Sequence, residues 1–290
     1  MTDAKGFIAG RPVLLYYALT FTISWGGVLI LTAAQGIPHS SEQVTRLMPL
    51  ALVATFAGPS VAGLLMTGLL GGRAGLRELR SRLLRWRVGA RWYAAALLTG
   101  PLLVAAILLG LSLVSPAFVP GIVTADKKLA LVLFGIGWGL VGGGFLEELG
   151  WTGFAVPRLR LAYGTVTTGL IVGLLWGAWH FLVAFWGSRG ISGEGSLAAF
   201  VAGFLIFYLG ALPAYRVLMV WVYDRTGSLL VAMLMHAVLS ASTLILQPTA
   251  TGAPYLTWNL VLAAALWLIV AAAAGWPWTA RATPAPERMT

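Results

Sequence analysis

Four ionisable side chains interrupt the long apolar runs of this sequence: Glu147, Glu148, His180 and His236. Ionisable groups at membrane depth are costly and are usually functional. A carboxylate beside a neutral histidine can activate a water molecule as a general base. The alternative is a divalent metal site, for example for zinc, formed by Glu147, His180 and His236. The spacing does not separate the two, although the sequence has no HExxH motif of the usual zinc proteases.

A hydroxyl group completes this candidate set. Ser240 lies one helical turn after His236, so both side chains could donate hydrogen bonds to a developing oxyanion. Glu147 and Glu148 are adjacent, and adjacent side chains of a helix point about 100° apart. One glutamate is therefore expected to take part in the reaction, and the other to orient the reacting groups. Single buried histidines are often structural, but two glutamates with two histidines favour catalysis or ion handling.

The composition shows what must position these residues. Of the 290 residues, 59% are hydrophobic and 10% are charged, whereas a soluble domain has about 25% charged residues. A bilayer must therefore cover most of the surface. Cysteine is absent, which excludes disulfides, thiolate metal sites and cysteine-protease chemistry. The net charge of +10 is interpreted as basic loops of a membrane protein, and no nucleic-acid partner is expected.

The apolar runs predict an all-α, polytopic membrane helical bundle. Crossing the hydrocarbon core takes about 20 residues of helix, and continuous runs exclude the alternating pattern of a barrel. The first run is too long for a signal peptide, so it is expected to be retained. The predicted spans are Val13–Ala33, Met48–Leu70, Trp92–Val114, Leu129–Leu149, Thr165–Trp186, Leu197–Val222, Ser228–Leu246 and Leu256–Trp276.

Basic residues predict the orientation of the eight spans. With both termini in the cytoplasm, 15 of the 19 Lys and Arg residues fall on the inside. Glu147 and Glu148 then close the fourth span near its cytoplasmic end. His236 and His180 lie deeper, so the four groups could line one cavity open to the cytoplasm. Arg216, near the cytoplasmic end of the sixth span, is expected to snorkel to the surface.

One domain is predicted, over residues 1–279, with its catalytic motifs in a core over 129–246. Residues 71–91 are basic, with Leu76, Leu79, Leu83 and Leu84 at helical spacing. They are interpreted as an amphipathic helix on the inner leaflet rather than a surface for an acidic partner. Residues 280–290 are expected to form a disordered cytoplasmic tail.

Three motifs in order carry a family resemblance. Residues 145–159 (FLEELGWTGFAVPRL) are similar to a Glu-Glu-x-x-x-Arg motif, and Trp176–His180 (WGAWH) to an aromatic-x-x-x-His motif. His236–Ser240 (HAVLS) is similar to a His-x-x-x-Asn motif. The sequence thereby resembles the CAAX-protease and bacteriocin-processing (Abi) family of intramembrane proteases, including type II CAAX prenyl endopeptidases. Residues 58–92 also resemble family members.

The resemblance implies an intramembrane endopeptidase of the glutamic type, formerly described as a metalloprotease, that cuts near the cytoplasmic membrane face. It implies that Glu147 and His180 activate water, and that His236 and Ser240 stabilise the oxyanion. Glu148, Trp176 and Thr152 would be supporting residues, and no cofactor is required. The expected partners are a peptide or membrane-protein substrate and lipids, in a bacterial cell membrane.

Two positions depart from the family pattern. Thr152 stands where the family has arginine, and Ser240 where asparagine is common. Serine can still donate a hydrogen bond, but a neutral Thr152 cannot hold a carboxylate by charge. The alternative function is therefore a non-catalytic member: a bacteriocin immunity factor, a membrane scaffold or a small transporter.

Overall fold

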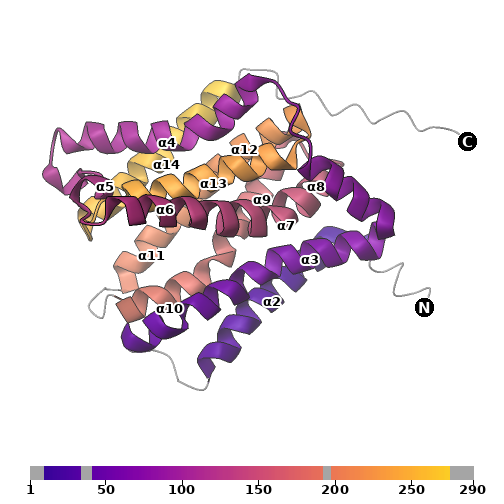
Figure 1. The fold of residues 1–290 in the computed structure, drawn as a ribbon, viewed down its shortest axis with the longest axis horizontal. Helices are drawn as coiled ribbons and strands as arrows, with labels where there is room; N and C mark the ends of the chain where they lie inside the picture. The colour runs from indigo at the N-terminus through magenta and orange to yellow at the C-terminus, as the bar shows by residue number, and fades with distance from the viewer. Residues whose placement is uncertain (1–9, 34–40, 192–196, 275–290) are drawn as a thin grey trace, which may run out of the picture.

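A computed structural model describes residues 10–33, 41–191 and 197–274, and the predicted tail at 280–290 lies outside them. This part of the chain is helical and contains no strand (Figure 1). Eight of its helical segments are long and apolar enough to cross a membrane, which confirms the all-α polytopic bundle. The cytoplasmic placement of both termini stays a prediction. The segments are Pro12–Ala33, Glu42–Leu83, Ala90–Ser112, Lys128–Leu159, Thr165–Ser188, Leu197–Thr226, Leu229–Leu246 and Ala253–Ala273.

Several spans are composed of more than one helical element. The elements before the fourth span are α2 (Pro12–Ala33), α3 (Ser41–Leu83), α4 (Ala90–Ser112), η1 (Pro116–Phe118) and α5 (Gly121–Thr124). The fourth span contains α6 (Lys128–Trp138), η2 (Gly139–Glu147), α7 (Glu148–Gly150), η3 (Trp151–Ala155) and α8 (Val156–Leu159). The remaining elements are α9 (Thr165–Trp179), α10 (Phe181–Ile191), α11 (Leu197–Ile206), η4 (Phe207–Ala211), α12 (Leu212–Thr226), α13 (Leu229–Leu246) and α14 (Ala253–Ala274).

The fourth span does not end at the glutamates. It continues through α8 to Leu159, so the prediction that Glu147 and Glu148 close it is wrong. The sequence is misleading here because two acids interrupt the hydropathy, whereas in the fold they are buried among partners. Elements η2 and η3 on either side of Glu148 are π-helical. Such wide turns occur mostly as short bulges at functional sites.

Glycines allow the helices that carry the site to approach closely. A Cβ atom at Gly169 of α9 would lie 2.5 Å from the Cα of Val217 on α12, so only glycine fits there. On the other side of the bundle, α13 packs against both α4 and η2. A Cβ at Gly144 of η2 would lie 2.9 Å from the carbonyl oxygen of Met233. These contacts fix α9, α12, α13 and η2 around a common centre.

The basic segment at 71–91 differs from its predicted form. Helix α3 bends at Gly72, whose φ of 54° suits glycine, and it ends at Leu83 instead of continuing to 91. Leu79 is 3% exposed and packs with Leu149 and Leu229, so it faces the bundle rather than lipid. Leu76 and Leu84 remain exposed. Part of the apolar face of this segment therefore packs against the protein, and part of it is exposed.

Candidate active site

Glu147 is buried and is held by two indole groups. Its Oε2 accepts hydrogen bonds from Trp176 Nε1 at 2.5 Å and from Trp151 Nε1 at 3.2 Å. Trp151 lies one turn further along the same span, and Trp176 lies on α9. Because both donors bond to Oε2, Oε1 is left for a water molecule. The carboxylate is thus oriented without a cation of its own.

Glu148 is held by a buried arginine from another span. Arg216 of α12 is 0% exposed, and its Nη1 and Nη2 each lie 2.8 Å from one carboxylate oxygen of Glu148. Thr152 donates its hydroxyl hydrogen to the same carboxylate. The prediction that Arg216 snorkels to the surface is therefore wrong. The carboxylate has a cation although residue 152 is neutral, because Arg216 reaches it from α12.

His236 joins the two halves of this cluster. Its Nδ1 lies 2.7 Å from Oε1 of Glu148, and since an ionised carboxylate only accepts, Nδ1 donates. The His236 ring packs edge-on against Trp176 at 4.8 Å, and the guanidinium of Arg216 lies 4.3 Å from the Trp176 ring. One indole therefore contacts Glu147, His236 and Arg216 together. Glu148 therefore contacts both Arg216 and His236, and it links these two side chains of the cluster.

His180 lies where the fifth span changes from α9 to α10. Its Nδ1 is 2.8 Å from the carbonyl oxygen of Trp176. A carbonyl can only accept, so Nδ1 carries the hydrogen, and Nε2 of the neutral ring is an acceptor. The ring also packs against Trp179 at 4.7 Å and Tyr208 at 4.9 Å. These contacts fix both the tautomer and the plane of the imidazole.

The two residues predicted to stabilise an oxyanion, His236 and Ser240, face a glycine. A Cβ atom at Gly143 of η2 would lie 2.6 Å from Ser240 Oγ and 2.9 Å from His236 Nε2. The two polar atoms therefore converge on the space that the missing side chain leaves open. If His236 donates from Nε2 while Nδ1 donates to Glu148, the ring must be the imidazolium. The two carboxylates of Glu147 and Glu148 would then balance the two positive charges of His236 and Arg216.

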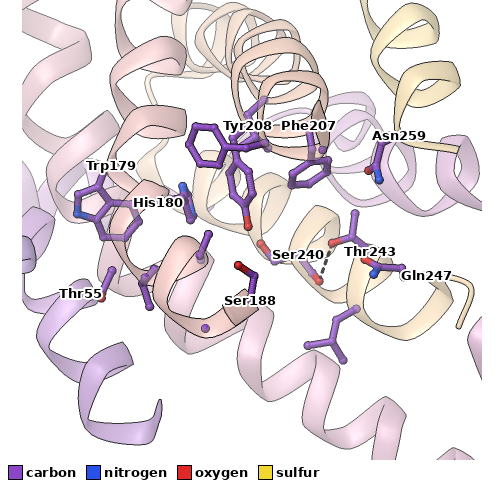
Figure 2. A pocket seen from close by; sticks show the side chains of 18 of the residues that line it. Thr55, Trp179, His180, Ser188, Phe207, Tyr208, Ser240, Thr243, Gln247 and Asn259 are labelled. Atoms are coloured by element: carbon purple, nitrogen blue, oxygen red, sulfur yellow. Dashed lines mark hydrogen bonds between the residues drawn. The ribbon is translucent and has the colours of Figure 1, made fainter. Parts of the chain in front are cut away.

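One cavity brings the predicted residues together. It has a volume of about 1100 Å³ and is lined by Glu147, Trp176, His180, His236 and Ser240. Figure 2 shows His180 with Trp179 on one wall and Ser240 across from them. Glu148 and Thr152 do not line the cavity, so the adjacent glutamates face different surroundings, as a helix requires.

The alternative metal set is not assembled as a ligand group. Among the residues that the structure describes, no three His, Asp or Glu side chains lie close enough to hold a metal ion. Glu147, His180 and His236 share the cavity, and one polar atom of each is held by another group: Glu147 Oε2 by indoles, His180 Nδ1 by a carbonyl and His236 Nδ1 by Glu148.

Three residues of this region were missed by reasoning from the sequence. Arg216 was misassigned, although an arginine inside a predicted span is itself a signal of function. Tyr208 lies in the π-helical element η4 and extends its hydroxyl into the cavity near Ser240 (Figure 2). Asn259, the only asparagine of the chain, also lines the cavity. Neither Tyr208 nor Asn259 belongs to a motif, so only the fold indicates them.

The order of the motif residues around one cavity agrees with a comparison against protein families. The model for Rce1-like type II CAAX prenyl endopeptidases matches residues 128–242. Residues 128–242 are thus similar to the Rce1-like family. This segment contains all three motifs and ends just after Ser240, which confirms the predicted resemblance. No curated protein matched the chain. At the family level this match supports an intramembrane CAAX-type protease, and together with the eight apolar helical segments it supports an integral, multi-pass membrane protein.

Proposed function

We propose that this chain is a glutamic-type intramembrane endopeptidase whose reaction centre is formed by Glu147, His180, His236 and Ser240. The observation that carries the proposal is their convergence on one cavity, with Glu148 held behind them by Arg216. We further propose a bacterial cell membrane as its location. Peptide segments inside or beside the bilayer are the substrates that this cavity would admit.

The proposed reaction starts with water between Glu147 and His180. Glu147 takes one proton, and His180 Nε2 accepts a hydrogen bond from the other, so that the oxygen can attack the peptide carbonyl. The carbonyl oxygen becomes an oxyanion that accepts hydrogen bonds from His236 and Ser240. Glu147 then returns its proton to the leaving nitrogen as the C–N bond breaks. Water is added across the bond, and no group on the protein is consumed.

The supporting roles follow from the contacts behind the cavity. Trp176 would orient Glu147 through its indole hydrogen bond. Glu148 would fix His236 through Nδ1 and keep Nε2 directed at the substrate. Thr152 and Arg216 would hold Glu148 in turn. The charge lost at position 152 is replaced from α12, which favours the protease over the non-catalytic alternative.

Cleavage of a quenched fluorescent peptide library tests the proposal, using the full chain in lipid nanodiscs. Wild type should cleave a subset of peptides, whereas Glu147→Gln and His180→Ala should each lose at least about 100-fold of that activity. A chelator should leave the wild-type rate unchanged, and inhibition by chelator would replace this mechanism with metal chemistry. If folded wild type cleaves nothing, an immunity factor, scaffold or transporter becomes the better assignment.

A further inference from the structure

The cavity extends well beyond the four proposed reaction-centre residues. Along α13, Ser240, Thr243 and Gln247 recur at helical spacing, and all three line it. Figure 2 shows Thr243, Gln247 and Asn259 grouped on the side of Ser240 away from His180. The distance from residue 240 to 247 is about 10 Å along a helix, which equals roughly three residues of extended peptide.

Asn259 is the most informative residue of this group. It lies in α14, outside the matched segment, and is 2% exposed. Its Nδ2 donates to the carbonyl oxygen of Tyr255 at 2.8 Å, so the amide oxygen remains as an acceptor on the cavity side. A buried amide in an otherwise apolar membrane helix is costly, and its partner is expected to be functional.

Thr243 has a similar arrangement. Its hydroxyl hydrogen is directed to helix carbonyl oxygens, with Leu239 O at 3.0 Å and Ser240 O at 3.1 Å. The hydroxyl oxygen can therefore only accept a further hydrogen bond. Gln247, at the end of α13, offers both an amide donor and an acceptor. All three side chains line the same cavity, to which they offer acceptors and a donor.

The facing wall is aromatic. Phe200, Phe204 and Phe207 line the same cavity, and the ring of Phe204 stacks on that of Tyr208 at 4.9 Å. Apart from tyrosines, the ionisable residues among the described lining of the cavity are Glu147, His180 and His236. No Lys or Arg is among these described lining residues. A charged headgroup would therefore lack a counter-charge, and an acyl chain would leave the amides unpaired.

We infer that Thr243, Gln247 and Asn259 form a subsite for the backbone of an extended, uncharged peptide segment, whose apolar side chains pack on Phe200, Phe204 and Phe207. Backbone N–H and C=O groups need partners wherever water is excluded, and these three side chains would supply them for about three residues on one side of the cleaved bond. The inference rests on the proposed function, because only a protease would cleave a bond of the bound peptide. Binding of the peptide itself does not require cleavage.

Binding is tested with the Glu147→Gln full chain in nanodiscs. The probe is a fluorescein-labelled decapeptide of Leu, Phe, Ala and Val, followed by fluorescence anisotropy against empty nanodiscs. Single N-methylation should weaken binding about 5- to 10-fold at no more than three consecutive positions, the loss expected for one hydrogen bond. Asn259→Leu and Thr243→Val should weaken the unmethylated peptide similarly and abolish the penalty of methylation at their position.

The matched control is Thr99→Val on α4, whose hydroxyl makes the same bond to the carbonyl four residues earlier but does not line the cavity. It should bind like the parent. Binding no better than to empty nanodiscs, or normal binding by both Asn259→Leu and Thr243→Val, would overturn the subsite. If binding depends on Thr243 and Asn259 but wild type cleaves no peptide, only the proposed function would be rejected.

Discussion

The guanidinium of Arg216 contacts both carboxylate oxygens of Glu148, which belongs to a different span. Nη1 lies 2.8 Å from Oε2, and Nη2 lies 2.8 Å from Oε1. Thr152, one turn beyond Glu148, bonds to the same carboxylate and lies 3.5 Å from Arg216 Nη1. Positions 152 and 216 therefore reach one carboxylate from two directions. A cation at either position could hold it.

Removing this cation should be severe. In Arg216→Leu, Glu148 loses its buried partner, and we expect a loss of about 3–5 kcal/mol in stability. Misplacement of His236 should lower kcat about 100-fold. The double variant Thr152→Arg/Arg216→Leu should recover part of both, measured by thermal unfolding and peptide cleavage. The exposed Arg46→Leu is the control, and a double variant no better than Arg216→Leu would disprove the equivalence.

The two indoles on Glu147 should differ in importance. Trp176→Phe keeps a ring beside Arg216 and His236 but removes the 2.5 Å hydrogen bond. We expect kcat to fall about 10- to 100-fold, because hydrogen bonds to charged groups contribute about 1.5–3 kcal/mol. Trp151→Phe removes the 3.2 Å bond to the same oxygen and should have the smaller effect on kcat. An equal or larger loss in Trp151→Phe would contradict this ranking.

A single methyl group at Gly143 should close the oxyanion side. The new Cβ would lie within 3 Å of both Ser240 Oγ and His236 Nε2, so these atoms must move. We expect Gly143→Ala to lose at least about 10-fold in kcat with little change in melting temperature. Gly137→Ala, in the same span with no atom within 4 Å of the added carbon, should keep full activity. Normal kinetics in Gly143→Ala would mean that the oxyanion lies elsewhere.

The close contact of α9 and α12 should be needed for both stability and activity. Gly169→Val places carbon against the backbone of Val217, and overpacking of this kind costs about 1–3 kcal/mol. Since α9 carries Trp176 and α12 carries Arg216, we expect cleavage to fall together with the melting temperature. Gly110→Ala on α4 has open space at its Cβ and should change neither. If Gly169→Val were destabilised but fully active, the close packing of α9 and α12 would not be needed for activity.

Much of the bundle was predictable because hydropathy reports directly on membrane burial. The predicted spans match the helices to within a few residues wherever no ionisable group intervenes, as in α4 and α13. The fourth span was cut short because the glutamates resemble a span end. Only tertiary contact with Arg216 and the indoles makes their burial possible, and a hydropathy pattern carries no information on such partners.

The candidate site was predictable where motifs mark it and not elsewhere. His180, His236, Ser240 and Glu147 were named from their order along the chain, and they line one cavity. The tautomer of His180 depends on a carbonyl oxygen, which no sequence pattern reports. Asn259 belongs to a helix far from the motifs in sequence, and its position in the same cavity as Ser240 and Thr243 is a property of the fold.

The pairing of Glu148 with Arg216 also has a consequence for the biogenesis of the protein. The partners are 68 residues apart, so at about 5–20 residues per second the ribosome needs roughly 3–14 seconds to make the second after the first. During that interval the fourth span meets the insertion machinery with an unmatched acid, at a cost of about 2.5–3.5 kcal/mol at the centre of a helix. The apolar residues of the fourth span must carry it into the bilayer alone, or the span must wait for the sixth to arrive.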